Sequence, residues 1–368
     1  MGDLSPAATP ALHYQAPLTL RLSIRWARAI RWEFWPAWLF YIPVVVYILW
    51  LGLRFGKPTV FTAANPAFAA GGVVGESKTE ALAPLQAQAP DTVARFETIA
   101  GRLAAGERIA QARRFVGDNT GYPVILKPDI GCRGRGVAVI RNDAQLCAYL
   151  QDAPGDVLVQ RYIDGEEFGV FVYRQPGSGE AVIYSITHKC FPVLLGDGRH
   201  TLAELIAADA RARLIAPLLW RRFAARLQDV PPPGERIALV EIGAHCRGSL
   251  FLDASHLATP ALRATIERIF AAIPGFRFGR LDLRCPSAAA LSAGEDLRVL
   301  EVNGVTAEAA HIYHPGTPLR VGYASIVRQW RIAFEIGAEQ ARHGAKLTGA
   351  FELLRLFRED LHRGKQWF

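Results

Sequence analysis

The sequence has few cysteines, and none of them is spaced for a metal site. Its five cysteines are Cys132, Cys147, Cys190, Cys246 and Cys285, and no two have CxxC spacing. An odd number of scattered cysteines argues against a disulfide framework and against a structural zinc site. We therefore expect small buried thiols in a reducing compartment.

The sequence also lacks a secretory signal peptide, a nucleic-acid-binding signature and an internal repeat. The apolar run begins more than thirty residues into the chain, and no small-residue cleavage site follows it. A net charge of +8 admits anionic lipids, anionic substrates and nucleic acid as partners. Because the basic residues are spread out, we expect no nucleic-acid partner. In 368 residues, 51% hydrophobic and 21% charged residues are typical of a soluble α/β body with one local apolar excess.

Residues 1–57 are predicted to start with disorder and to end in a membrane-associated segment. The first seventeen residues are rich in proline and alanine. Between Leu18 and Glu33, arginines recur at helical spacing among apolar residues. That pattern predicts a basic amphipathic helix on an anionic bilayer surface, and an ordinary solvated helix is the alternative.

The stretch from Phe34 to Leu53 carries no charge and is just long enough to cross a bilayer as a helix. Its tryptophans and tyrosines suit the membrane interface. Pro36 and Pro43 are expected to interrupt it, and both of its flanks are basic. A re-entrant insertion at the cytoplasmic face of the inner (cell) membrane is therefore favoured over a span. A buried core helix is the remaining alternative.

The rest of the chain indicates an α+β body of strands and helices. Residues 58–75 predict a short strand over 58–63 and a Gly-rich loop, and helical patterning follows over 76–87 and 91–112. Further helices are predicted over 143–151, in the stretch 201–228, and as an amphipathic basic helix within 336–368. The strands, recognised by their β-branched and aromatic residues, are predicted at 122–128, 137–140, 157–162, 168–174, 181–189, 236–242, 279–284 and 297–302.

A lysine followed by a glycine-rich loop is the first feature that indicates chemistry. Lys127 ends a β-rich run, and the loop places glycines at Gly131, Gly134 and Gly136. Glycines let backbone N–H groups approach phosphates closely, and the lysine adds a positive charge. The loop lies between two strands and so is neither a P-loop nor a dinucleotide-binding fingerprint. A plain glycine hairpin loop would look the same.

Oxygen ligands at the ends of two later strands are the second feature. Asp282 lies in the strand at 279–284, Glu301 lies near the end of the strand at 297–302, and Asn303 follows that strand. Carboxylates and a side-chain carbonyl, completed by nucleotide phosphates, form the ligand set that Mg²⁺ prefers. A magnesium site is therefore predicted downstream of the phosphate loop.

With these motifs in this order, residues 76–335 resemble the ATP-grasp superfamily, which includes D-alanine–D-alanine ligases, glutathione synthetases and cyanophycin synthetases. The resemblance implies an α+β ATP-grasp fold in which two α/β subdomains clamp ATP. It implies that ATP phosphates, adenine and ribose are bound by Lys78, Lys127, Gly131, Gly134, Gly136, Gln160, Arg161, Ile163 and Glu167.

The resemblance also implies the reacting end of the site. Lys189 resembles a further phosphate lysine, and Arg280 falls on the arginine that steadies an acyl-phosphate. Asp282, Glu301 and Asn303 fall on the Mg²⁺ ligands, where Mn²⁺ is an alternative ion. Arg247 is predicted to bind a substrate carboxylate, whereas His311 and His314 are candidates for the acceptor side without an assigned role.

The sequence departs from the family at its substrate end. After Asn303 it lacks the Ser-Pro-Gly run of the dipeptide ligases, which puts a D-alanine substrate in doubt. The apolar segment also stands where much of a substrate domain is expected. The predicted function is ADP-forming carboxylate–amine ligation through an acyl-phosphate at a membrane surface, with a carboxylate and an amine as substrates and a homodimer left open. An ATP-grasp phosphotransferase, a carboxylate–thiol ligase and a non-catalytic nucleotide-binding membrane module are the alternatives.

Overall fold

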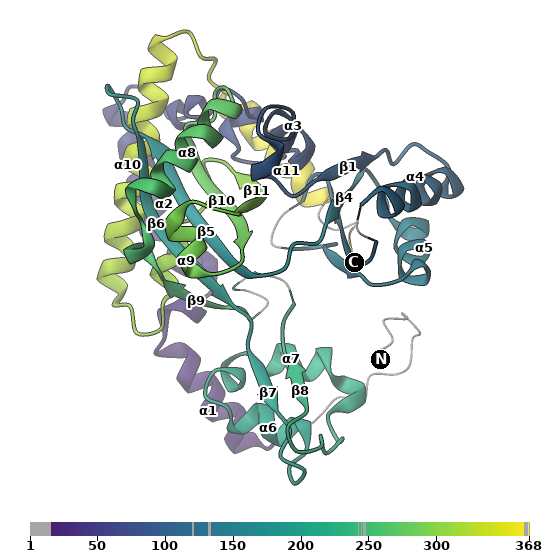
Figure 1. Ribbon diagram of the computed structural model, residues 1–368. Coiled ribbons are helices and arrows are strands. Elements are labelled where there is room, and N and C mark those ends of the chain that lie inside the picture. Colours follow the sequence, from purple (N-terminus) through teal and green to yellow (C-terminus); the bar gives the residue numbers. More distant parts are fainter. Residues whose placement is uncertain are drawn as a thin grey trace. The chain divides into compact units, whose positions relative to one another are not determined.

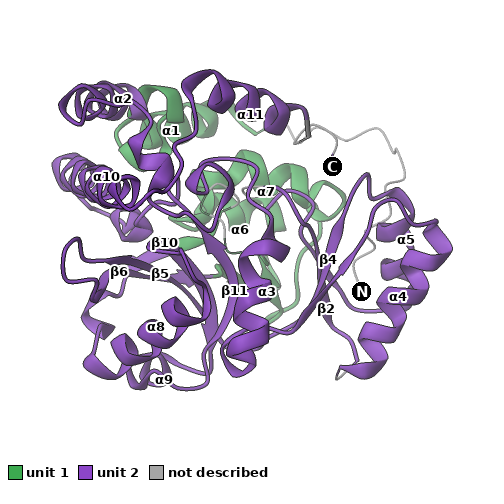
Figure 2. Ribbon diagram, turned by 90° about the horizontal axis from the view of Figure 1, so that it is seen from above, with its two compact units in different colours: residues 1–40, 191–250 green, residues 41–190, 251–368 purple. Residues whose placement is uncertain are grey.

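A computed structural model describes residues 16–119, 121–131, 134–241, 243, 245, 248–363 and 367. These residues divide into two compact units, which are coloured separately in Figure 2. Unit 1 combines the described residues up to Phe40 with Phe191–Leu250, and unit 2 combines Tyr41–Cys190 with Phe251–Phe368. Unit 1 therefore joins two stretches that lie far apart in the sequence.

The larger sheet of unit 2 has five strands in the order β11-β10-β5-β6-β9 (Figure 1). Its strands are β5 (Glu166–Arg174), β6 (Ala181–Cys190), β9 (Leu250–Asp253), β10 (Phe278–Cys285) and β11 (Arg298–Asn303). β5 lies at the centre and pairs antiparallel with β10 and β6, and β10 pairs antiparallel with β11. The hairpin predicted over 168–189 and the two acidic strands are confirmed.

Helices cover both faces of this sheet, because alternate residues of its central strands point to opposite sides. Phe168 and Val170 of β5 join a core with α3 (Lys78–Gln88), α8 (Pro260–Ala272) and α9 (Ala288–Ala293). Phe171 and Tyr173 join a second core with α10 (Leu319–Arg342) on the other face. β5 is buried along almost its whole length as a result.

The smaller sheet of unit 2 has four strands in the order β1-β4-β2-β3. Its strands are β1 (Phe96–Ile99), β2 (Val124–Pro128), β3 (Ala138–Ile140) and β4 (Val157–Arg161), and every pairing is antiparallel. The helices α4 (Ala105–Asp118) and α5 (Asp143–Asp152) pack on it through a separate core. The predicted α+β class, with two α/β subdomains, is confirmed.

Unit 1 is small and has a core of its own. It contains α1 (Leu18–Ala29), α6 (Leu202–Ala208) and α7 (Ala216–Arg222), with the two-stranded sheet of β7 (Val193–Leu195) and β8 (Arg236–Ala238). Ile24 of α1 packs with Leu194 of β7 and Leu202 of α6. Within the same unit Glu33 forms a partly buried ion pair of 3.1 Å with Arg211.

The predicted apolar segment forms α2 (Ala37–Arg54), which passes from unit 1 into unit 2. Among the described residues, it is the one helix whose length and composition would allow it to cross a membrane. Pro36 precedes this helix and Pro43 lies inside it, so the predicted interruption at Pro43 does not end the helix. The last helix, α11 (Ala350–Arg363), lies within the predicted C-terminal segment.

Three predicted elements are wrong. The strand over 58–63 is replaced by a 3-10 helix at Val60–Ala63, where four consecutive buried residues pack against α10 and no neighbouring strand is available. The helix over 91–112 is replaced by β1 and the later start of α4, because residues 96–99 pair with β4. The segment 336–368 is not one helix, since α10 continues to Arg342 before α11 begins.

Candidate functional site

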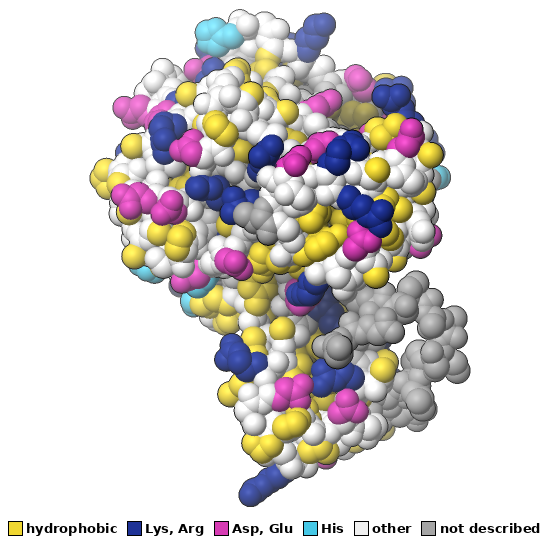
Figure 3. Space-filling model, turned by 45° about the vertical axis from the view of Figure 1, so that its right-hand side comes forward, with side chains coloured by type: hydrophobic (Ala, Val, Ile, Leu, Met, Phe, Trp, Pro, Cys, Tyr) yellow, Lys and Arg dark blue, Asp and Glu magenta, His cyan; other side chains and the backbone are white. Residues whose placement is uncertain are grey.

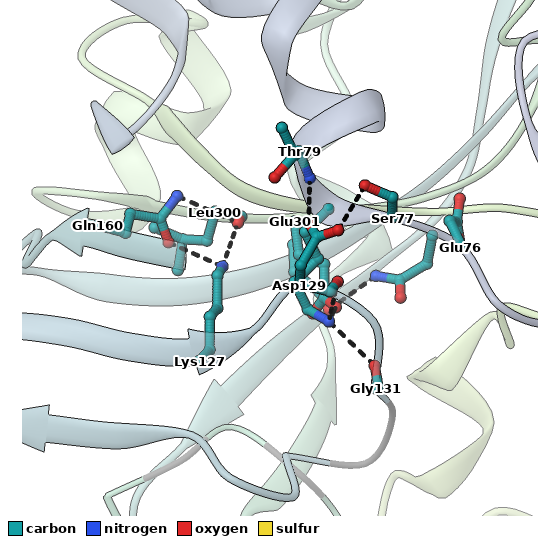
Figure 4. A network of polar contacts seen from close by, with 12 residues as sticks. Glu76, Ser77, Thr79, Lys127, Asp129, Gly131, Gln160, Leu300 and Glu301 are labelled. Atoms are coloured by element: carbon teal, nitrogen blue, oxygen red, sulfur yellow. Dashed lines mark hydrogen bonds and ion pairs between the residues drawn. The ribbon is translucent and has the colours of Figure 1, made fainter. Parts of the chain in front are cut away.

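Lys127 is a buried lysine near the end of β2, held by two hydrogen bonds (Figure 4). Its Nζ donates to the side-chain carbonyl of Gln160 at 2.8 Å and to the backbone carbonyl of Leu300 at 2.9 Å. Burial lowers the pKa of Lys127 to about 8. Residues of β2, β4 and β11 thus meet at the Lys127 ammonium. Its two hydrogen-bond acceptors are neutral, and they use two of its three N–H donors.

Lys78 begins α3 and is held against the end of β2. Its Nζ donates to the backbone carbonyls of Asp129 at 3.3 Å and Gly131 at 3.0 Å. It also lies 3.7 Å from a carboxylate oxygen of Glu301 on β11. Lys78 and Lys127 therefore approach β11 at adjacent residues, Leu300 and Glu301.

The start of α3 is fixed by two side chains that the sequence analysis did not single out. The Ser77 hydroxyl accepts the N–H of Glu80 as the N-cap and donates to Asp129 at 2.8 Å. The other carboxylate oxygen of Asp129 accepts the backbone N–H of Thr79 at 2.7 Å (Figure 4). The spacing of Ser77 and Glu80 is a helix-start signal that would have identified the cap, whereas no local pattern indicates Asp129.

Lys189 and Arg280 surround Asp282 in the larger sheet. The Lys189 ammonium lies 3.0 Å from Asp282 and 3.2 Å from Glu167. Arg280 binds both oxygens of Asp282, through Nε at 2.8 Å and Nη2 at 3.1 Å. Burial alone would raise the pKa of Asp282, but Arg280 and Lys189 outweigh it and hold that pKa below its ordinary value. Glu167 is further paired with Arg284 at 3.1 Å.

The three predicted metal ligands lie together on the paired strands β10 and β11. Asp282 stands directly opposite Glu301 in the strand register, and Arg280 stands opposite Asn303. The amide of Asn303 donates to Asp282 at 3.3 Å. Among the described residues, no group of three or more histidine, cysteine, aspartate or glutamate side chains could hold a metal ion. The predicted trio has only two carboxylates, so a cation there would also need the amide oxygen of Asn303 and further oxygen ligands.

Glu76 is a carboxylate near this trio that sequence reasoning missed. One of its oxygens accepts the N–H of Gly304 at 3.2 Å, and the other is buried without a hydrogen-bond partner among the described residues. Burial, together with the smaller effect of the neighbouring Glu301 carboxylate, raises the pKa of Glu76 to about 8. An unpaired buried oxygen beside a second carboxylate is a place where a cation would be favourable.

The glycine loop is described only in part, whereas the predicted adenine segment is described throughout. Gly134 and Gly136 have φ values of 70° and 67°, a left-handed conformation that favours glycine. Gly131 contributes its carbonyl to Lys78, as described above, while Cys132 and Arg133 lie outside the described residues. The structure does not direct Arg161 into the cluster, because its side chain is exposed. The carbonyl of Ile163 accepts a hydrogen bond from Arg284 at 2.8 Å.

The remaining candidate residues are His311, His314 and Arg247. His314 accepts the backbone N–H of Asp253 at 3.1 Å, and His311 packs against the ring of Tyr184. Burial lowers the pKa of His311, so its ring favours the neutral form. The predicted substrate residue Arg247 lies outside the described residues. Arg280 also donates a hydrogen bond to the backbone carbonyl of Glu308 at 3.1 Å.

The central part of the chain matches a known protein family. Residues 86–166 match the family model described as the ATP-binding domain of the carbamoyl-phosphate synthase L chain. The match contains β1, β2, β3 and β4, and with them Lys127, the glycine loop and Gln160. No curated protein matches this sequence.

Solved structures with a similar arrangement include three ligases. The D-alanine–D-alanine ligase of Bacillus anthracis is 11% identical at a TM-score of 0.40, and the match covers 73% of this chain and 68% of that one. The VanG D-Ala:D-Ser ligase of Enterococcus faecalis is 16% identical at a TM-score of 0.41, and the match covers 70% of this chain and 61% of that one. The bifunctional glutathione synthetase of Pasteurella multocida is 17% identical at 0.36, covering 69% of this chain and only 36% of that enzyme.

At these TM-scores and identities the solved structures carry no argument about activity. The family match is more informative about ATP binding, because it falls on the segment where the ATP-grasp resemblance predicted phosphate and adenine contacts. The fold predicted from the sequence, with two α/β subdomains of the ATP-grasp kind, agrees with this match to an ATP-binding domain. The matched segment is of the kind found in the ATP-binding domain of the carbamoyl-phosphate synthase L chain.

Proposed function

We propose that this chain is an ADP-forming carboxylate–amine ligase that acts through an acyl-phosphate at the cytoplasmic face of the cell membrane. The observation that supports it most directly is the convergence of cationic side chains on the paired strands β10 and β11. The cations are Lys78, Lys127, Lys189 and Arg280, and they lie beside Asp282, Leu300 and Glu301. A triphosphate needs that concentration of positive charge beside hard oxygen ligands.

The residues on β10 and β11 fit a divalent cation. Asp282, Glu301 and Asn303 offer oxygen atoms of the hard type that Mg²⁺ and Mn²⁺ bind. The unpaired oxygen of Glu76 beside Glu301 is consistent with a cation at this place. When bound, the ion would neutralise charge on the ATP phosphates and on the transferring group.

In this reaction the chain has to position the two substrates and to screen the repulsion between their negative charges. A carboxylate oxygen of the first substrate bonds to the γ-phosphorus of ATP, the bond from that phosphorus to the β–γ bridging oxygen breaks, and ADP leaves. The acceptor amine then bonds to the acyl carbon, phosphate leaves with the carboxylate oxygen that had bonded to phosphorus, the other oxygen remains as the amide carbonyl, and the amine proton passes to solvent. Lys78 and Lys127 screen the repulsion between the two anions, and Arg280 steadies the acyl-phosphate.

ATP binding would rearrange ion pairs that already exist. Lys189 is bonded to Glu167 and Asp282, and Arg280 holds both oxygens of Asp282. The phosphates of a nucleotide would therefore replace carboxylates as partners of Lys189 and Arg280, and the cation would replace these two side chains as a partner of Asp282. Each charge in the site would keep a partner of opposite sign. Such preorganisation lowers the cost of gathering charge at the moment of reaction.

The membrane part of the proposal depends on α1 and α2. α1 exposes Leu18, Leu22, Trp26 and Ile30 at four-residue spacing, and it contains arginines and no acidic residue. α2 exposes a row of apolar side chains and has an arginine at its end. Because these helices stand where a larger substrate domain was expected, we propose that one substrate is itself amphiphilic or membrane-bound.

The test is phosphate release from Mg-ATP by the purified full-length chain with mixtures of candidate carboxylates and amines. Substrate-stimulated ADP and phosphate are the expected products, and Asn303→Ala and Lys127→Ala should each reduce turnover by about a hundredfold or more. AMP and pyrophosphate would contradict the acyl-phosphate route. ATP binding without turnover in any mixture would favour a nucleotide-binding module, and product formation only with a thiol acceptor would favour a thiol ligase.

A further inference from the structure

The C-terminal helix α11 exposes an apolar face that no described part of the chain covers. Phe351 is 91% exposed, and Leu354, Phe357 and Leu361 are exposed beside it at helical spacing. The opposite side of the helix is held by the protein, because Leu353 packs against the core shared by α10 and the end of α2. α11 is therefore anchored on one side and apolar toward solvent on the other.

α2 has the same two-sided construction within unit 2. Leu51 is only 1% exposed and belongs to the buried cluster that contains Phe334 of α10, and Phe55, just after the helix, packs on the Phe334 ring. On the outer side Val46 and Leu49 are exposed, and Leu53 is 83% exposed. The carboxyl-terminal half of α2 thus lies along the folded unit.

The two helices lie on the same side of unit 2, as Figures 1 and 2 agree. Leu51 of α2 and Leu353 of α11 contact one hydrophobic cluster, so the outer faces of both helices turn away from the same core. We call the exposed side chains of these faces the apolar ridge: Val46, Leu49, Leu53, Phe351, Leu354, Phe357 and Leu361.

The charges around the apolar ridge favour an anionic bilayer as its occupant. Arg54 ends α2 and Lys57 follows it, whereas α11 exposes both Arg355 and Arg358 and the acidic Glu352 and Glu359 beside its apolar residues. From Phe34 to Lys57 the chain has no acidic residue, and Trp50 suits the boundary between headgroups and acyl chains. On the face of unit 2 drawn in Figure 3, by contrast, cationic and anionic side chains are interspersed.

We propose that the apolar ridge docks unit 2 onto an anionic bilayer with α2 in the membrane plane and with α11 as a second membrane contact. The proposal deepens, and rests on, the membrane association proposed above. A spanning α2 would have to pull Leu51 and its neighbours out of the core that they share with α10, whereas an in-plane α2 leaves that core intact. In this arrangement both flanks of α2 remain on one side of the bilayer.

The first experiment asks whether α11 contributes to binding. The full-length chain is mixed with vesicles of equal parts phosphatidylcholine and phosphatidylglycerol, and the vesicle-bound fraction is measured by flotation. The variant combines Phe351→Glu, Leu354→Glu and Leu361→Glu. Its matched control places the same charge on exposed positions of α5, through Ala144→Glu, Ala148→Glu and Gln151→Glu. The α11 variant should partition at least about tenfold more weakly than the control, and equal flotation of the two would overturn the role of α11.

The second experiment asks whether α2 lies in the plane. In a background whose native cysteines are replaced by alanine, Ser23→Cys and Lys57→Cys place one exposed thiol before α2 and one after it. A membrane-impermeant thiol reagent outside the vesicles should label both positions before the vesicles are permeabilised. Protection of either position until permeabilisation would show a spanning helix and would overturn the proposal.

Nucleotide binding by the same preparations separates this proposal from the ligase proposal. The α11 variant should keep the ATP affinity of the wild-type chain in mild detergent, which also shows that it has folded. Loss of both ATP binding and flotation would indicate unfolding, in which case the single substitution Phe351→Glu replaces the triple variant. A wild-type chain that floats but binds no ATP would remove the ligase and leave the docking face in place.

Discussion

Glu308 is a half-buried carboxyl whose side chain has one described hydrogen-bond partner, the hydroxyl of Tyr313 at 2.9 Å. Burial raises its pKa to about 7. Between its unfolded pKa of about 4.5 and this value, the folded chain binds more protons than the unfolded chain, so stability falls as pH rises.

The first prediction is that Glu308→Gln removes this part of the pH dependence. Glu308 should make the wild-type free energy of unfolding decrease between pH 4.5 and 7 by a few kcal/mol at most, in addition to the decrease that Glu76 contributes up to about pH 8. The variant should lack the Glu308 part of that decrease and keep the Glu76 part. Denaturant unfolding in mild detergent at several pH values measures the difference between the two proteins, and parallel curves would contradict the assignment.

Local sequence was informative for residues that sit in a recognisable pattern. Lys127 before a glycine loop, and Asp282 and Glu301 on strand-forming segments, lie where the patterns suggested, although their roles stay predictions. Glu76 and Glu308 could not be found in this way, because their importance comes from burial by residues more than two hundred positions away or by a turn with no sequence signal. Arg161, which the family resemblance selected, is exposed.

At the scale of elements, α3 is the helix that carries Lys78 to the site, and its N-cap links it to β2 through Asp129. α5 begins with a comparable cap, in which Asn142 accepts the N–H of Gln145 at 2.9 Å, but α5 carries none of the predicted site residues. The N-caps of α3 and α5 are therefore comparable in structure, and only the cap of α3 lies beside the predicted site.

The second prediction is that Ser77→Ala and Asn142→Ala cost similar stability, about 1 kcal/mol each, but differ in their effect on ATP. Only Ser77→Ala should weaken ATP binding, because it loosens the helix start that positions Lys78 and Asp129. Thermal unfolding and nucleotide titration of both variants measure the two effects. An equal loss of ATP affinity in both would mean that general destabilisation is responsible.

Elements whose residues pair locally were predicted well, and those that depend on distant partners were not. The hairpin of β5 and β6 follows from alternating β-branched and aromatic residues around a turn. β1 was predicted as helix, since its strand conformation depends on pairing with β4, about sixty residues later in the chain. The 3-10 helix at Val60–Ala63 similarly depends on packing against α10.

At the scale of the whole molecule, the apolar segment is part of the folded body as well as a candidate membrane element. Composition could identify it as apolar, but composition could not reveal that one of its faces completes the core of unit 2. Nor could the sequence reveal that the N-terminal residues and Phe191–Leu250 form one unit, because that grouping depends on contacts between distant stretches.

The third prediction compares the two faces of α2. Leu51→Ala should destabilise the chain by about 2–5 kcal/mol, because it opens a cavity in a buried cluster. Leu49→Ala, on the exposed face of the same helix, should change stability by less than about 0.5 kcal/mol in detergent. Unfolding of both variants is the measurement, and an equal effect would contradict the packing of α2 on unit 2.

The most direct test of the central claim is calorimetric titration of the full-length chain with ATP in the presence of Mg²⁺. Wild-type chain and Arg102→Ala, which removes an exposed arginine of unit 2, should bind equally well. Lys78→Ala and Lys127→Ala should each weaken binding by about tenfold to a hundredfold, the value of one charge-assisted contact with phosphate. Unchanged affinity in both lysine variants would contradict the assignment of this site to ATP.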